Sequence, residues 1–130
     1  MNSKTIIVVD DDKDIREGLE EFLQIAGYLV RTASNGEEGL KVIRELKGHC
    51  VVLLDLQMPV MSGQEMLRAL EGDPDIEVQN VPVLIITAGH EVTGQRRERL
   101  NKPINLKDLL KKITGLSFSP LPKLAKILGC

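Results

Sequence analysis

Short apolar runs, separated by longer polar stretches, make up most of the chain. The runs are continuous rather than alternating, and several are rich in Val, Ile and Leu. Uninterrupted runs of this length are typical of strands that are buried on both faces of a parallel sheet. The strands predicted in this way are residues 4–9, 50–54 and 81–86. Residues 28–33 (YLVRTA) are predicted as a further strand, and a short last strand ends at Lys102.

Between these runs, apolar residues recur every three or four positions, which predicts amphipathic helices. Each helix should begin at a residue that caps helix N-termini, and two of these residues are followed three positions later by a Glu that completes a capping box. The caps are Asp12, Ser34 with Glu37, Ser62 with Glu65, and Asn105. The last helix should place four apolar residues on one side: Leu106, Leu109, Leu110 and Ile113.

Alternation of strands and helices predicts an α/β fold with a doubly wound, five-stranded parallel sheet covered on both faces. A chain of 130 residues is enough for one such domain. We expect the domain to cover residues 1–115 and residues 116–130 to form a C-terminal tail. Crossovers between parallel strands are nearly always right-handed, so the carboxyl ends of the strands should share one edge of the sheet.

Composition narrows the possible classes of function. The formal net charge of −2 argues against a nucleic-acid-binding surface, which usually shows an excess of basic residues. No apolar run approaches the roughly 18 residues needed to span a membrane. The two cysteines, Cys50 and Cys130, do not form the pattern of a disulfide framework or a zinc site. We therefore expect a cytoplasmic protein without membrane insertion.

Polar residues end the predicted strands. Asp10 and Asp11 follow the first strand, Asp55 the third, Thr87 the fourth, and Lys102 ends the last. Taken singly, each has an ordinary explanation, since an Asp after a strand often caps a helix and a Thr suits a strand. In open parallel sheets, however, ligands bind outside the carboxyl ends of the strands, so all five side chains should face one crevice.

These residues suit phosphoryl transfer assisted by a divalent metal ion. Three neighbouring carboxylates repel one another, and a hard cation such as Mg²⁺, which takes oxygen ligands, resolves this repulsion. The same ion would neutralise an incoming phosphoryl group beside a carboxylate nucleophile. Thr87 offers a hydroxyl donor and Lys102 a point charge for phosphoryl oxygens.

The motifs IIVVDDDKDIR, VVLLDLQMPVMSGQEML, VLIITA and KP resemble, in order and spacing, the receiver domains of two-component response regulators. The resemblance covers residues 4–113 and implies the flavodoxin-like receiver fold. It also implies a partnership with a sensor histidine kinase or phosphotransfer protein, signalling to a downstream protein, and dependence on Mg²⁺. The residue roles that it implies are Asp10, Asp11 and the Gln57 main-chain carbonyl as metal ligands, Asp55 as the phospho-acceptor that also binds the metal, Thr87 as the switch hydroxyl and Lys102 as the phosphoryl-binding lysine.

The sequence departs from this family after the fourth strand. Only residues 88–101 separate Thr87 from Lys102. A strand of five residues spans roughly 17 Å, and a helix that returns this distance needs about eleven residues. The helix that follows the fourth strand should therefore be short or irregular. Arg99 stands where the family has an aromatic switch residue, and the sequence leaves open whether the Lys102–Pro103 bond is cis.

Two other functions compete with the receiver hypothesis. A receiver-like module that binds partners without phosphorylation would have no need of the strand-end acids, Thr87 and Lys102. A phosphohydrolase with an aspartate nucleophile typically carries a second acid two residues after the nucleophile, where this chain has Gln57. We therefore expect a phosphorylated signalling protein and not an enzyme.

Overall fold

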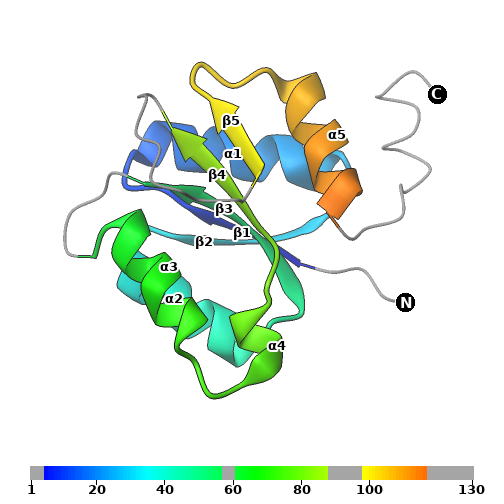
Figure 1. The fold of residues 1–130 in the computed structure, drawn as a ribbon. Coiled ribbons are helices and arrows are strands. Elements are labelled where there is room, and N and C mark those ends of the chain that lie inside the picture. The colour runs from blue at the N-terminus through cyan, green and yellow to red at the C-terminus, as the bar shows by residue number, and fades with distance from the viewer. Residues whose placement is uncertain (1–4, 57–60, 88–97, 117–130) are drawn as a thin grey trace.

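The computed structural model describes residues 5–56, 61–87 and 98–116, and the fold is built from these ranges (Figure 1). Five strands alternate with helices along the chain. The elements are β1 (Thr5–Val9), α1 (Lys13–Ile25), β2 (Leu29–Ala33), α2 (Gly36–Glu45), β3 (Cys50–Asp55), α3 (Gly63–Glu71), α4 (Ile76–Gln79), β4 (Val83–Thr87), β5 (Glu98–Asn101) and α5 (Leu106–Leu116).

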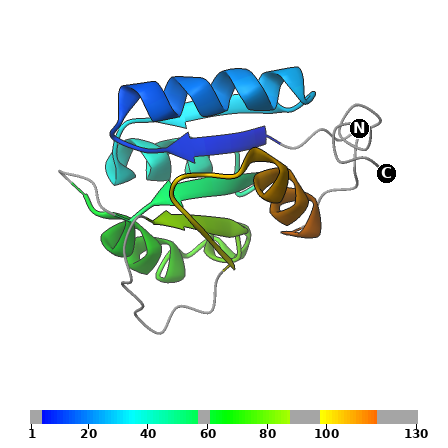
Figure 2. The same ribbon diagram turned by 90° about the horizontal axis from the view of Figure 1, so that it is seen from above.

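The strands form one parallel sheet in the order β2-β1-β3-β4-β5, which confirms the predicted architecture. The arrows of β1 and β4 point the same way when the molecule is viewed from above (Figure 2). From β1 the chain first adds β2 on one side and then places β3, β4 and β5 on the other. This reversal between β1 and β3 opens a crevice at their carboxyl ends, where ligands bind in such sheets.

Aliphatic side chains fill the space on both faces of the sheet. Alternate residues of β1 point to opposite faces, so that Ile7 and Val9 pack toward α2 and α3, and Ile6 and Val8 toward α1 and α5. Figure 1 shows the two helix layers above and below the sheet. This arrangement is the doubly wound one that the apolar runs predicted.

Most predicted helix starts agree with the structure. The Asp12 carboxylate accepts the Asp14 and Ile15 N–H groups at 2.9 and 3.2 Å, which caps α1 as predicted. Ser62 and Glu65 form the predicted capping box at α3. Together these contacts satisfy N–H groups that the first turn of a helix leaves without partners.

The predicted start of α2 was wrong by one residue. Asn35, not Ser34, caps the helix by accepting the Glu38 N–H at 2.9 Å. Glu38 in turn accepts the Ser34 N–H at 2.8 Å, so Glu38 takes the place that Glu37 was predicted to fill. Adjacent Ser and Asn residues are nearly equal as caps, and the helix register selected between them.

Two further expectations need correction. The stretch between α3 and β4, where the sequence predicted no helix start, contains the short helix α4, capped by Asp75. In α5, Leu109, Leu110 and Ile113 are buried as predicted, but Leu106 is 41% exposed. Leu106 is the first residue of α5 and lines a surface hollow instead.

The predicted short helix after β4 and the C-terminal tail fall in residues 88–97 and 117–130, outside the described residues. In the described part of the chain, no helix has both the length and the apolar character needed to cross a bilayer.

Candidate functional site

The site lies at the carboxyl ends of β1 and β3, the two central strands. Val9 pairs with Leu54, so the next residues along, Asp10 and Asp55, lie side by side at the edge of the sheet. Both residues are buried, at 3% and 7% exposure respectively, whereas the neighbouring Asp11 is exposed. One carboxylate oxygen from each of these three residues lies within 4.8 Å of the others. The structure therefore brings the three predicted acids together.

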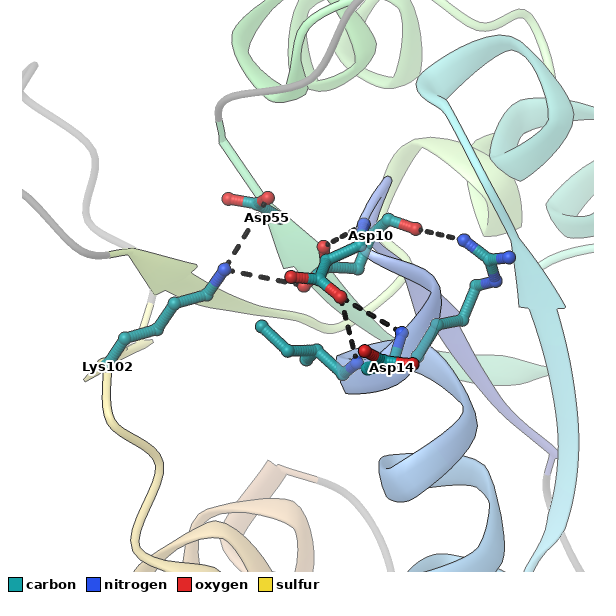
Figure 3. A network of polar contacts seen from close by, with 7 residues as sticks. Asp10, Asp14, Asp55 and Lys102 are labelled. Atoms are coloured by element: carbon teal, nitrogen blue, oxygen red, sulfur yellow. Dashed lines mark hydrogen bonds and ion pairs between the residues drawn. The ribbon is translucent and has the colours of Figure 1, made fainter.

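Lys102 faces the two buried acids from the far side of the crevice (Figure 3). Its Nζ lies 3.5 Å from Asp10 Oδ2 and 3.7 Å from Asp55 Oδ2. The Lys102 N–H donates to the Thr87 carbonyl at 2.9 Å, which holds the lysine main chain one residue beyond β5. The Lys102–Pro103 bond, left open by the sequence, is cis. Lys102 thus lies where its predicted role requires it to be.

Thr87 is the last residue of β4 and is 2% exposed. Its neighbour Ile86 pairs with Asp55, so Thr87 lies one step beyond the acceptor on the adjacent strand. This position at the strand end is the one predicted for a hydroxyl that serves the site. Gln57, the remaining predicted ligand, lies outside the described residues.

Gly63 brings helix α3 against the main chain of the acceptor strand. A Cβ atom at this position would lie 2.6 Å from the Asp55 carbonyl oxygen and 2.6 Å from the Leu56 Cα atom. The Gly63 N–H donates to the Leu56 carbonyl at 2.9 Å. Only glycine allows this approach, so α3 begins close to the end of the acceptor strand.

The main chain and side chain of Asp10 are fixed by four contacts. Its Oδ1 accepts the Asp12 N–H at 2.9 Å, and its Oδ2 faces Lys102. Its own N–H donates to the Ala33 carbonyl of β2 at 3.1 Å, and its carbonyl accepts from the Arg16 guanidinium at 2.9 Å. Sequence reasoning missed Arg16. The available signal was a basic residue in the first turn of a helix, where acidic residues are the favoured kind.

The charge of the site suits a hard divalent cation. The three carboxylates and the Lys102 ammonium give a formal charge of −3 + 1 = −2, and the Arg16 guanidinium at the Asp10 carbonyl reduces this excess to −1. In a half-buried crevice such an excess is costly, because like charges repel more strongly where water is partly excluded. Carboxylate oxygens are the ligands that Mg²⁺ prefers. The donor set therefore fits the metal that the sequence predicted.

The chain is similar in sequence to curated response regulators from bacteria. The chain is 36% identical over 118 residues to Response regulator RR06 of Streptococcus pneumoniae, covering 85% of this chain and 52% of the relative. It is 33% identical over 132 residues to the Transcriptional regulatory protein CpxR homolog of Haemophilus influenzae, covering 94% and 55%. The chain thus spans about half the length of these curated relatives.

Solved structures and a family model agree with these relatives. The chemotaxis protein CheY4 of Vibrio cholerae superposes with a TM-score of 0.75 at 30% identity, covering 87% of this chain and 98% of that one. A putative response regulator from Chloroflexus aurantiacus gives a TM-score of 0.76 at 27% identity, covering 87% and 96%. The model of the response regulator receiver domain matches residues 6–114. The chain therefore belongs to the receiver domain family of two-component response regulators.

Proposed function

We propose that Asp55 accepts a phosphoryl group from a phosphohistidine on a sensor histidine kinase or phosphotransfer protein. The reaction depends on Mg²⁺, and the phosphorylated domain changes its contacts with a downstream protein. The observation that carries this proposal is the approach of the Asp10, Asp11 and Asp55 carboxylate oxygens to within 4.8 Å of one another, with Lys102 against the two buried acids.

The three acids have separable tasks in this reaction. Asp10 and Asp11 would hold Mg²⁺ together with Asp55 and, by the family resemblance, the Gln57 carbonyl. When bound, the metal neutralises negative charge on the acids and on the phosphoryl group. An Asp55 carboxylate oxygen attacks phosphorus, an O–P bond forms, and the P–N bond to the donor imidazole breaks. Asp55 is placed for this attack because it ends β3 and so faces the crevice.

Lys102 and Thr87 would bind the oxygens of the transferred group. The Lys102 ammonium already lies 3.7 Å from Asp55 Oδ2, so it is close enough to pair with a phosphoryl group on that carboxylate. Thr87 carries a hydroxyl on the neighbouring strand end, and a hydroxyl that donates to an anionic oxygen forms a strong hydrogen bond. Phosphorylation adds about −1.5 to −2 charge, which would draw both side chains toward Asp55.

A hollow beside Lys102 supports a protein as the donor. It has a volume of about 410 Å³ and lies between the first turns of α1 and the segment that joins β5 to α5. Its lining is largely apolar and includes Ile15, Leu19, Pro103, Ile104 and the exposed Leu106. An apolar surface next to the acceptor suits a protein that must bring its phosphohistidine to Asp55.

The chemistry of this site favours transfer onto the protein over turnover of small phosphate esters. Position 57, two residues after the nucleophile, is a Gln that cannot serve as a general acid. We therefore expect p-nitrophenyl phosphate to be hydrolysed no faster with the protein than in buffer. Sustained turnover that disappears in Asp55→Asn would contradict this part of the proposal.

The main test is incorporation of phosphate from a small donor. Wild-type protein incubated with phosphoramidate and Mg²⁺ should gain the mass of one phosphate group, and EDTA or Asp55→Asn should abolish the gain. Asp73→Asn is the matched control, because it also removes a buried carboxylate but lies at the opposite edge of the sheet. If wild type gains no phosphate, or if Asp55→Asn still gains it, the proposal is wrong.

A further inference from the structure

The Arg16 side chain links helix α1 to the end of strand β1. Arg16 lies in the first turn of α1, where its N–H donates to the Asp12 carbonyl at 2.9 Å. One guanidinium nitrogen donates to the main-chain carbonyl of Asp10 at 2.9 Å. A hydrogen bond from a charged donor is roughly twice as strong as a neutral one. Arg16 therefore holds the chain firmly at the point where β1 leaves the sheet.

The bond that Arg16 holds is the peptide between Asp10 and Asp11. The Asp10 N–H is fixed by the Ala33 carbonyl on one side, and the Asp10 carbonyl by Arg16 on the other. Because a peptide unit is planar, fixing its carbonyl also fixes the direction in which the next residue continues. The next residue is Asp11, whose carboxylate is exposed yet lies within 4.8 Å of those of Asp10 and Asp55.

The charge of Arg16 also affects an acidic residue on α2, Glu38. Hydrogen bonds from the N–H and hydroxyl of Ser34 hold the pKa of Glu38 below its usual range, and the positive charge of Arg16 lowers this pKa further. The Glu38 carboxylate accepts the two Ser34 donors at 2.8 and 3.0 Å. The Arg16 guanidinium itself is held by its hydrogen bond to the Asp10 carbonyl.

We propose that Arg16 is a positioning residue for the metal site. By holding the Asp10–Asp11 peptide, it keeps the Asp11 carboxylate turned toward those of Asp10 and Asp55 so that all three can bind Mg²⁺. This inference rests on the proposed Mg²⁺-dependent function. It does not follow from charge alone, because a cation beside a metal site repels the metal and weakens its binding.

The two effects of Arg16 have opposite signs, so substitution separates them. If Arg16 acts through position, Arg16→Met should raise the Kd for Mg²⁺ on the order of tenfold, as removal of outer residues that orient metal ligands usually does. If Arg16 acts only through its charge, the same change should lower the Kd. Arg16→Lys keeps the charge and one donor, so it should raise the Kd by a smaller factor.

The experiment is an Mg²⁺ titration of each variant without a phosphodonor, followed by calorimetry or by the amide shifts of Asp11 and Asp12. Lys13→Met is the matched control, because it removes the same charge from the same turn of α1. Lys13 is exposed, and its ammonium lies 3.9 Å from the Glu17 carboxylate on the same helix. Its Kd should equal that of wild type or be slightly lower.

Phosphorylation rates against Mg²⁺ concentration give a second measurement. In Arg16→Met the Mg²⁺ concentration for half-maximal rate should rise with the Kd, while the rate at saturating Mg²⁺ stays within about twofold of wild type. A loss of stability alone would not shift this concentration. If Arg16→Met does not fold, the same comparison in Arg16→Lys decides the matter.

The outcomes separate this inference from the proposed function. If wild type binds Mg²⁺ and accepts phosphate, but both Arg16 variants bind Mg²⁺ as tightly as wild type or more tightly, the positioning role is wrong and the function stands. If wild type binds no Mg²⁺ at millimolar concentrations, both proposals fail.

Discussion

The acidic side chains at the carboxyl edge of the sheet, where the strands end, have different surroundings from those at the amino edge, where the strands begin. At the carboxyl edge, Asp10, Asp11 and Asp55 gather within 4.8 Å of one another, and Lys102 is shared between the two buried acids. The described groups at this edge therefore carry an excess of negative charge. The ion pairs described for the two buried carboxylates both go to the one Lys102 ammonium.

At the amino edge, where β3 and β4 begin, the acids have partners of their own. Asp73 is as buried as Asp55, yet its carboxylate accepts from Arg44 Nε at 3.0 Å and from the Asp75 N–H at 2.9 Å. Asp75 caps α4, and Glu77 contacts His49 at 2.9 Å. The hydrogen bonds from Asp75 and Arg44 hold the pKa of Asp73 below its ordinary value.

This difference distinguishes acids that stabilise the fold from acids that serve a ligand. A buried carboxylate with a cation and an N–H donor contributes to stability where it lies. The three carboxylates at the carboxyl edge repel one another, and this repulsion lowers the stability of the fold. A bound metal ion would relieve it. Burial alone therefore does not identify a functional acid, but burial combined with unbalanced charge does.

The largest effect expected from this comparison is stabilisation by Mg²⁺ through the carboxyl edge alone. At a hundred times its Kd, a ligand that binds only the folded state raises the free energy of unfolding by about 2.7 kcal/mol. Wild type should show this gain in urea denaturation with and without Mg²⁺. At the same Mg²⁺ concentration the gain should largely disappear in Asp11→Asn and remain in Asp73→Asn. Equal gains in the two variants would contradict the comparison.

A somewhat smaller effect is expected at high pH from Tyr28, which precedes β2 at the amino edge. Burial raises the pKa of Tyr28 to about 12 from an ordinary value of 10.0. The folded state thus keeps a proton that the unfolded state loses, so stability is complete below pH 10 and falls as the pH rises toward 12. The loss should reach about 2 kcal/mol.

The Tyr28 prediction can be measured directly, because this is the only tyrosine and the chain has no tryptophan. Absorbance of tyrosinate near 295 nm should rise with a midpoint near pH 12 in the folded protein. The comparison of wild type with Tyr28→Phe in urea removes the contribution of lysines that titrate in the same range. A tyrosinate midpoint at pH 10 in the folded state would show that burial does not suppress ionisation.

The smallest effect, and the sharpest test of the comparison, is a difference in sign without metal. In EDTA, Asp55→Asn should raise the free energy of unfolding by about 1 kcal/mol, because it removes repulsion among the three carboxylates. Asp73→Asn should lower it, because Arg44 and the Asp75 N–H lose an anionic partner. Urea denaturation at pH 7 measures both.

The pH dependence of the same pair provides a control. The pKa of Asp73 is lowered in the folded state, so its contribution to stability is present above its ordinary pKa of 3.8 and is lost as the pH falls below that value. The difference between wild type and Asp73→Asn should therefore shrink in acid.

A destabilised Asp55→Asn in EDTA would mean that Lys102 more than compensates the repulsion.

Much of the fold could be read from local patterns. Continuous apolar runs located β1, β3 and β4 to within two residues, because strands buried on both faces leave little room for polar residues. The edge strand β2 was also located, although most of its residues are not fully buried. Helix starts were predictable at Asp12 and Ser62, because each is a residue type that caps helices and each precedes apolar residues at helical spacing. Local patterns were ambiguous where neighbours compete, as Ser34 and Asn35 do. They were silent for α4, because its four residues are too few to show a helical period.

The site was only partly predictable for the same reason. Asp10, Asp11, Asp55, Thr87 and Lys102 were identifiable because each one ends or follows an apolar run. Arg16 was not identifiable, because it contacts a main-chain carbonyl. Every residue has such a carbonyl, so the residue types in the sequence do not indicate this contact. The close approach of Gly63 to Asp55 is similar, since a glycine needed for space looks the same in sequence as a glycine needed for a turn.

By itself, then, the order of apolar and polar residues determined which segments become strands, which polar residues lie at their ends, and that those ends meet at one edge. The tertiary structure alone decided which acids share a cation, which acids have partners of their own, and which side chain holds the Asp10–Asp11 peptide. The physical reason is the distance along the chain over which each effect acts. Periodicity and capping act over a few residues along the chain, whereas charge balance depends on groups that folding brings together from distant positions, as it does for Asp10 and Lys102.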